Sequence, residues 1–171
     1  MLRRLLLTAA VAVLPALLGG CANYQLGTAG TPAFRTLYIE PAANKTLLPQ
    51  VQALLSTRIR ETFARDGRVQ LVNSAAGADA ILSLTIDTYR REIAAVREGD
   101  TGLARKFNVT LGATCSLRDN RGNRAIFEKR TLSAVREVFT DSGQLQSEYQ
   151  TLPLLSDALA AKVAHAALDA W

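Results

Sequence analysis

The stretch KFNVTLGATCSLR, residues 106–118, alternates apolar and polar side chains almost without interruption. The polar positions between the apolar ones include Asn108, Thr110, Thr114 and Ser116. Because successive side chains of a β-strand point to opposite faces of the sheet, this period of two predicts a strand with one wet and one dry face. Such a strand is typical of an antiparallel sheet that is covered on one side only.

The flanking segments extend this pattern into a three-strand meander. ADAILSLTIDTYR (78–90) places apolar residues at alternate positions, and the turn sequence DNRGN (119–123) leads into a further strand over 124–139. Two shorter strands are expected at 35–41, closed by Pro41, and at 68–72. These segments together predict four to five strands.

Two segments with apolar residues at every fourth position predict the helices. The first covers 44–67, with Thr46 as its N-cap and Gly67 at its end, and the second covers 154–170. The apolar stripes are Val51, Leu55, Ile59 and Phe63 in the first helix and Leu155, Leu159, Val163 and Ala166 in the second. The sequence therefore predicts a single α+β domain over 35–171, with two helices packed on one face of a mixed, mostly antiparallel sheet of four to five strands.

The first 20 residues are typical of a targeting segment. Arg3 and Arg4 precede the apolar run LLLTAAVAVLPALL (5–18), which is shorter than the roughly 20 residues that a membrane-spanning helix needs. The sequence LGGC (18–21) then resembles the bacterial lipoprotein box, in which the signal is cut before the cysteine and the cysteine is acylated. We therefore expect a lipoprotein signal peptide over 1–20, lipid attachment at Cys21 and a lipidated tether over 21–34. Ala22, where an aspartate would favour the inner membrane, points to the outer membrane.

Composition and charge are those of a globular protein and do not indicate a nucleic-acid-binding protein. The chain has 171 residues, of which 49% are hydrophobic and 20% charged, as in an ordinary globular domain. The formal net charge is +5, and without Arg3 and Arg4 the remaining 18 basic and 15 acidic residues give +3. This excess is too small to indicate nucleic-acid binding. With Cys21 acylated, Cys115 has no cysteine partner within the chain and is expected to be a buried, inert thiol.

The residue types that carry catalysis are sparse. His165 is the one histidine, and no CxxC, HExxH, GxSxG or phosphate-loop pattern occurs. We therefore expect no enzyme activity, no cofactor and no metal site, with His165 on the surface of the last helix.

Basic residues gather at two places. The segment REIAAVREGDTGLARK (91–106) is expected to be a long loop. With the residue before it, this loop carries Arg90, Arg91, Arg97, Arg105 and Lys106 against Glu92, Glu98 and Asp100. A second basic cluster follows the next strand, at Arg118, Arg121, Arg124, Lys129 and Arg130. A strand of about twelve residues spans roughly 40 Å, so the two clusters should lie at opposite ends of the sheet. Each is either a site for a phosphate-rich ligand or a solvated hairpin end.

Three short motifs, in order along the chain, resemble the lipopolysaccharide-assembly lipoprotein family LptE. They are CANYQLG (21–27), YIEPAANKT (38–46) and ADAILSLTI (78–86). The resemblance implies a fold of two helices on a mixed sheet, at the outer membrane with the domain facing the periplasm. It also implies a complex with the large β-barrel LptD, in whose lumen the domain sits as a plug, and help in delivering lipopolysaccharide. Arg90, Arg91, Arg105 and Lys106 are then candidates for contact with lipopolysaccharide phosphates.

Other envelope lipoproteins share the anchor and similar strand openings. An activator of a cell-wall synthase and a subunit of a secretion channel therefore remain as alternative functions.

Overall fold

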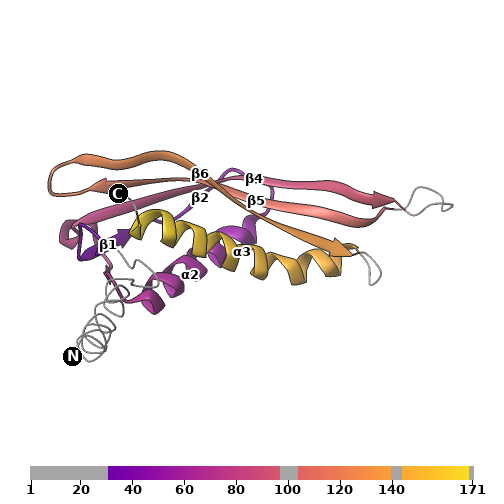
Figure 1. Ribbon diagram of the computed structural model, residues 1–171, viewed down its shortest axis with the longest axis horizontal. Helices are drawn as coiled ribbons and strands as arrows, with labels where there is room; N and C mark the ends of the chain where they lie inside the picture. The colour runs from indigo at the N-terminus through magenta and orange to yellow at the C-terminus, as the bar shows by residue number, and fades with distance from the viewer. Residues whose placement is uncertain (1–30, 97–103, 140–143, 170–171) are drawn as a thin grey trace, which may run out of the picture.

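A computed structural model describes residues 31–96, 104–139 and 144–169 of the chain. Within them, two helices cover the same face of a six-stranded mixed sheet, as Figure 1 shows. The predicted α+β class is confirmed, with one short strand more than expected.

The strands follow the order β3-β1-β4-β5-β6 across the sheet, and the short β2 lies beside β4. β1 pairs in parallel with β3 and β4, whereas β4, β5 and β6 form an antiparallel meander. The strands are β1 (Thr36–Ile39), β2 (Ala43–Asn44), β3 (Gln70–Val72), β4 (Ala80–Val96), β5 (Ala104–Asp119) and β6 (Arg124–Phe139). The helices are α2 (Pro49–Asp66) and α3 (Gln144–Leu168), with a 3₁₀ turn at Ala75–Gly77.

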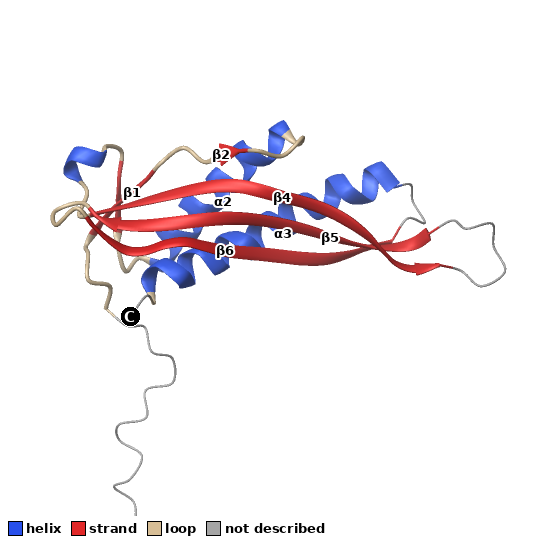
Figure 2. Cartoon of the chain, turned by 90° about the horizontal axis from the view of Figure 1, so that it is seen from above, coloured by secondary structure: helices blue, strands red, loops and turns tan. Residues whose placement is uncertain are grey.

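The meander makes the domain long. β5 and β6 have 16 residues each and β4 has 17, which corresponds to about 53–56 Å of strand. Figure 2 shows these three strands side by side, with β1 and β2 accompanying only part of β4. We call the end that holds residues 31–36 and the β5–β6 turn the proximal end. The opposite end, which holds residues 90–96, 104–110 and 135–139, is the distal end.

The core lies between the helices and the covered face of the sheet. Val51, Leu55, Ile59 and Phe63 of α2 are all buried, as are the four stripe residues predicted for α3. The covered face contributes alternate residues of β5, from Val109 to Leu117, all at most 1% exposed. Both predicted apolar stripes are therefore confirmed.

Three predicted boundaries were wrong. The expected loop at 91–106 is mostly strand, since β4 continues to Val96 and β5 begins at Ala104. α2 begins at Pro49 rather than at 44, because the Thr46 hydroxyl accepts from the Leu48 N–H in the turn before the helix instead of capping it. α3 begins at Gln144, ten residues before the predicted start, and accommodates Pro153 in its interior.

A β-bulge at Asp87 reverses the facing of β4. Ile86 pairs with Ala113 and Thr88 pairs with Gly112, so Asp87 is an extra residue without a partner in β5. Even-numbered residues face the helices before the bulge, and odd-numbered residues from Tyr89 face them after it. This reversal decides which side of the sheet each distal arginine occupies.

Candidate binding surfaces

The structure places three of the four predicted basic residues, and it divides them between the two faces of the sheet. Cys21, the predicted lipid site, lies outside the described residues. Arg90 shares a cross-strand row with Thr110 and Val135 on the open face of the sheet. Arg91 shares the next row with the buried Val109 and is on the helix-covered face. Lys106 is again on the open face, opposite Phe139, and the backbone places Arg105 between Ala104 and Lys106 on β5.

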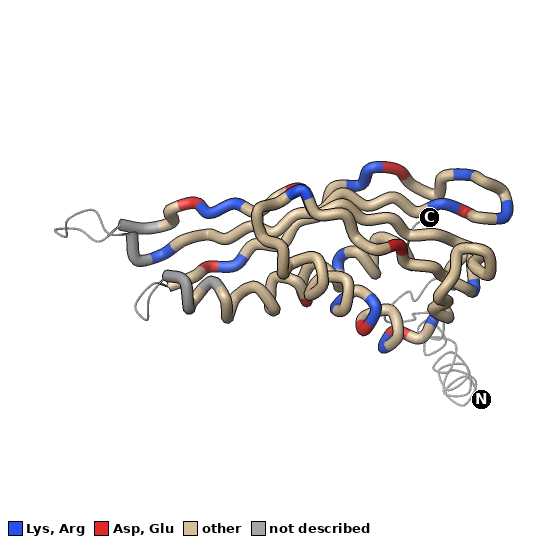
Figure 3. Tube along the Cα trace, turned by 180° about the vertical axis from the view of Figure 1, so that it is seen from behind, with Lys and Arg blue, Asp and Glu red and all other residues tan. Residues whose placement is uncertain are grey.

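On the open face, the distal charges are partly paired. The Lys106 ammonium lies 2.6 Å from the Glu137 carboxylate and 5.6 Å from the centre of the Phe139 ring. The Arg90 guanidinium lies 3.6 Å from Glu92, in a pair that is mostly exposed. Figure 3 shows basic and acidic residues close together at this end. An anionic ligand at this surface would therefore compete with carboxylates that are already present.

The rest of the open face is polar, as predicted. Asp87 accepts a 2.6 Å hydrogen bond from the Thr114 hydroxyl and a 2.9 Å bond from the Thr88 hydroxyl. Gly112 leaves room here, because a Cβ on this residue would lie 2.9 Å from the Thr88 Cβ. The open face therefore presents a band of short hydroxyl side chains between the two ends.

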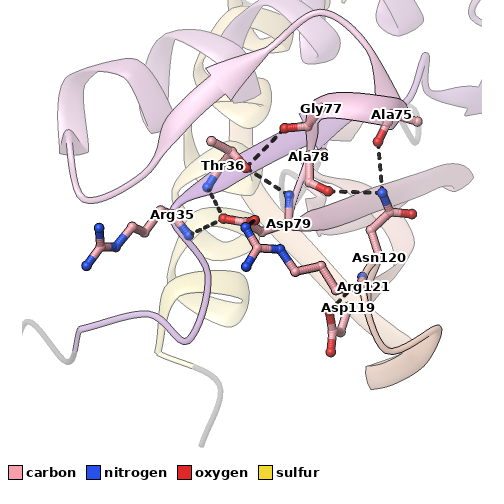
Figure 4. A network of polar contacts seen from close by, with 9 residues as sticks. All are labelled: Arg35, Thr36, Ala75, Gly77, Ala78, Asp79, Asp119, Asn120 and Arg121. Carbon is pink, nitrogen blue, oxygen red and sulfur yellow. Dashed lines mark hydrogen bonds and ion pairs between the residues drawn. The ribbon is translucent and has the colours of Figure 1, made fainter.

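At the proximal end, the Asp79 carboxylate joins three segments that are distant in sequence (Figure 4). Its Oδ2 accepts from the backbone N–H groups of Arg35 and Thr36, both at 3.0 Å, and its Oδ1 pairs with Arg121 in the β5–β6 turn. The Asp79 N–H in turn donates to the Thr36 hydroxyl at 2.8 Å. The Asn120 amide donates to the carbonyls of Ala75 and Ala78 at 2.8 and 2.9 Å.

This arrangement explains the motif ADA at 78–80. Ala78 and Ala80 are buried, while Asp79 between them holds the chain that enters β1. The two backbone N–H donors and Arg121 favour the charged carboxylate, and they lower the pKa of Asp79. The motif is visible in the sequence, but neither Asp79 nor Asn120 was predicted to have a role. An aspartate between two small residues at the start of a strand was the available signal.

The second basic cluster is at the proximal end, opposite the first, as predicted, but its members differ in environment. The Arg118 guanidinium bonds the Asn123 side chain at 3.1 Å, and Arg121 pairs with Asp79. Arg130 donates to the Ala166 carbonyl at 3.2 Å and lies 4.4 Å from the centre of the Phe127 ring. Arg124 and Arg121 line a cavity of about 740 Å³ beside residues 32–35 and the end of α3.

Cys115 and His165 are not brought together. Cys115 is buried on the covered face of β5, where burial raises the pKa of its thiol to about 11. His165 lies on the surface of α3, with 81% of its side chain exposed. Over the described ranges, no three histidine, cysteine or carboxylate side chains are grouped to hold a metal ion. None of the helices described here is both long enough and apolar enough to span a bilayer.

Solved structures with this architecture come from several bacteria. Protein XCC0632 from Xanthomonas campestris superposes with a TM-score of 0.61 at 11% identity, over 82% of this chain and 88% of that one. A minor lipoprotein from Acinetobacter baumannii gives 0.53 at 21% identity, over 79% and 93%. Rare lipoprotein B from Shewanella oneidensis gives 0.51 at 16% identity, over 79% and 92%. At these identities the similarity establishes the fold alone.

The amino-acid sequence gives a more specific result. Comparison with curated proteins yields no significant match. A family model described as "LptE: Lipopolysaccharide-assembly" matches residues 34–168, which is nearly all of the predicted domain.

Proposed function

The chain belongs to the LptE lipopolysaccharide-assembly family, and from this premise we propose that it is an outer-membrane lipoprotein that partners an LptD-like β-barrel. The family is a non-enzymatic lipoprotein family, which agrees with the separation of Cys115 from His165. In the proposed role the domain faces the periplasm and helps to deliver lipopolysaccharide to the outer membrane.

The anchor in this proposal is the acylated Cys21. The support is the order of a basic start, an apolar run of 14 residues and the sequence LGGC before this cysteine. Each buried methylene of an acyl chain contributes about 0.8 kcal/mol, so two or three chains give lasting attachment. The described chain enters β1 at the proximal end, beside the Asp79 carboxylate. A tether over 21–34 would therefore hold the protein by its proximal end.

The barrel partner is supported by the family and by the shape of the domain. The long meander leaves an open face of short hydroxyl side chains, which can exchange hydrogen bonds with water or with a polar barrel wall. No large apolar residue of the proximal half of the described sheet is exposed, whereas Ile93, Val135 and Phe139 at the distal end are more than half exposed. We propose that the distal half enters the barrel.

Lipopolysaccharide contact is proposed at Arg90, Arg91, Arg105 and Lys106. Guanidinium groups bind phosphates through charge-assisted hydrogen bonds, which suits the phosphates of lipopolysaccharide. Since Arg90 and Lys106 lie on the open face and Arg91 on the covered face, one phosphate group is not expected to meet all of them. The open-face pair and Arg91 are therefore two separate candidate contacts, and Arg105 is a candidate that is not assigned to either face.

The observation that carries the proposal is the family match over 34–168. Its test is to purify the tagged protein from membranes in mild detergent and to identify what accompanies it. We expect a large outer-membrane β-barrel in near-stoichiometric amount, and a Cys21 peptide carrying acyl chains by mass spectrometry. Recovery of a penicillin-binding protein or of a self-assembled ring would favour the alternative functions instead. A free Cys21 thiol would reject the anchor.

Lipopolysaccharide binding is tested by reversing the charge of the four distal basic residues. Reversal of Arg90, Arg91, Arg105 and Lys106 to glutamate should weaken binding to immobilised lipopolysaccharide. The matched control reverses four exposed basic residues that belong to neither basic cluster, Arg35, Lys45, Arg65 and Lys162, with the same change in net charge. Reversal of Arg90 and Lys106 alone, of Arg91 alone and of Arg105 alone then assigns the contact to particular residues. Equal binding by the distal and control variants would remove the distal residues from the proposal.

A further inference from the structure

The free edge of β6 is protected in its proximal half and open in its distal half. In the described part of the sheet, β6 pairs only with β5, so its other edge has no strand partner. Exposed edges of this length promote uncontrolled pairing, and proteins usually block them with bulges and charged side chains. A stretch of the β6 edge without such protection is therefore a candidate site for an added strand.

Two features block the proximal half. The pairing with β5 is irregular between Phe127 and Arg130, where Lys129 has a φ of 50° and its N–H bonds the Ser116 hydroxyl. Farther along, the Lys162 ammonium of α3 binds the Ser133 carbonyl at 2.6 Å. That carbonyl points away from β5, so Lys162 occupies a position that an added strand would need.

The distal half, Ala134–Phe139, carries the charged residues Arg136 and Glu137, but among the described residues it has neither a bulge nor a side chain bound to its outward backbone groups. Backbone groups of alternate residues in an antiparallel strand point to opposite edges. Since the Ser133 carbonyl points outward, the N–H and C=O groups of Val135 and Glu137 point outward as well. The Val135 and Phe139 side chains beside them are 55% and 57% exposed. Unpaired backbone groups flanked by exposed apolar side chains are the features of a strand-addition site.

A second copy of the chain fits this edge poorly. Antiparallel pairing of two β6 edges centred on Arg136 or on Glu137 would place like charges directly opposite each other, which is destabilising. Centring on Val135 avoids this, but it pairs Glu137 of one copy with Ser133 of the other. The outward carbonyl of Ser133 is already bound by Lys162.

The side chains around the edge define what an added strand should carry. Val135 and Phe139 on the open face favour apolar residues beside them. Arg136 is on the opposite side of the strand, is exposed, and contacts no charged group in the described part of the chain. A neighbouring acidic residue would complement it, whereas Glu137 is already paired with Lys106.

We propose that the β6 edge at Ala134–Phe139 binds an extended segment of another protein by strand addition, and that this segment alternates apolar with acidic residues. The proposal is independent of acylation at Cys21 and of the identity of the barrel, so it can fail or hold separately from the proposed function.

The first test measures backbone protection with a defined probe. The full chain, extracted from membranes and labelled with ¹⁵N, is mixed with the peptide acetyl-VDVDVDV-amide, and amide hydrogen exchange is followed by NMR. The Val135 and Glu137 amides should exchange about tenfold more slowly at a peptide concentration about nine times the dissociation constant. The amide of Leu132, which faces β5, should be unchanged. The interrupted peptide acetyl-VDVPVDV-amide should not protect, because proline lacks an N–H.

The second test uses two kinds of variant. Val135→Pro removes an outward N–H and should abolish protection, while the matched control Thr131→Pro, in the protected half, should leave it intact. If Val135→Pro does not fold, Arg136→Glu provides the test, since it should lose the aspartate peptide and bind acetyl-VKVKVKV-amide. No protection of wild type by the aspartate peptide would overturn the proposal, as would equal protection by the interrupted peptide. Protection of Val135 in a peptide-free dimer would show that a second copy is the occupant.

Discussion

Ser156 offers a sharp test of how α3 packs into the core. Its side chain on α3 is fully buried, and its hydroxyl has no hydrogen-bond partner among the described residues. A buried polar group without a partner costs about 1–3 kcal/mol of stability. Replacing serine by alanine inside a helix adds about 0.5 kcal/mol through helix propensity. We therefore expect Ser156→Ala to raise the free energy of unfolding by about 1.5–3.5 kcal/mol.

The measurement is urea unfolding followed by circular dichroism. With a slope near 2 kcal/mol per molar urea, the midpoint should rise by about 0.8–1.8 M at an unchanged slope. Ser56→Ala is the matched control, because the Ser56 hydroxyl on α2 donates to the Gln52 carbonyl at 2.7 Å. The control keeps the helix-propensity gain and lacks the desolvation gain. A midpoint for Ser156→Ala at or below that of Ser56→Ala would refute the reasoning.

Three further predictions concern the sheet and the proximal end. Gly112→Ala should lower the free energy of unfolding, measured in urea, by about 1–3 kcal/mol, because the new Cβ would lie 2.9 Å from the Thr88 Cβ. An unchanged unfolding midpoint would mean that the bulge relaxes to make room for it. At pH 8, Cys115 should react with iodoacetamide at least about a hundredfold more slowly in the folded chain than in urea, because its pKa rises from 9.0 to about 11. Rapid alkylation of the folded protein, seen by mass spectrometry, would contradict this. Asp79→Ala should lower stability at pH 7 and flatten the loss of stability in acid. The reason is that the lowered pKa of Asp79 gives stability that is present above pH 3.8 and is lost as pH falls through the folded-state pKa. Parallel curves of unfolding midpoint against pH for the wild type and the variant would exclude that role.

The sequence predicted the covered face of the sheet and the buried stripes of the helices well, because those depend on local periodicity. Val51, Leu55, Ile59 and Phe63 repeat every four residues, and each is buried. The alternation over 106–118 placed Cys115 on the dry face, where it is 1% exposed. Hydrophobic burial dominates the stability of such elements, so a periodic pattern is sufficient evidence for them.

The faces of the candidate basic residues were predicted less well, because the bulge at Asp87 lies between the alternating part of β4 and Arg90. Arg90 and Arg91 are adjacent in sequence, and their assignment to faces depends on the extra residue Asp87. Gly112 in the neighbouring strand permits the close approach of Thr88, a contact between residues 24 positions apart. Periodicity within one strand contains no information about that contact.

The expected loop over 91–106 was wrong for a related reason. Its charged residues reduce the apolar signal, and strands that extend beyond the helices need fewer apolar residues than those in the core. The role of Asp79 was also missed, because its partners Thr36 and Arg121 are brought to it only by the folded sheet.

The three long antiparallel strands lie side by side and give the domain a fixed length from its proximal end to its distal end. Inserting two residues at matching positions in each of β4, β5 and β6 would increase that length by about 6–7 Å while every side chain kept its side. Inserting one residue in each would turn the outermost part inside out, so that Arg91 and Arg90 exchanged surroundings. Chain length in this arm can thus change only in even steps if what the tip presents is to stay the same.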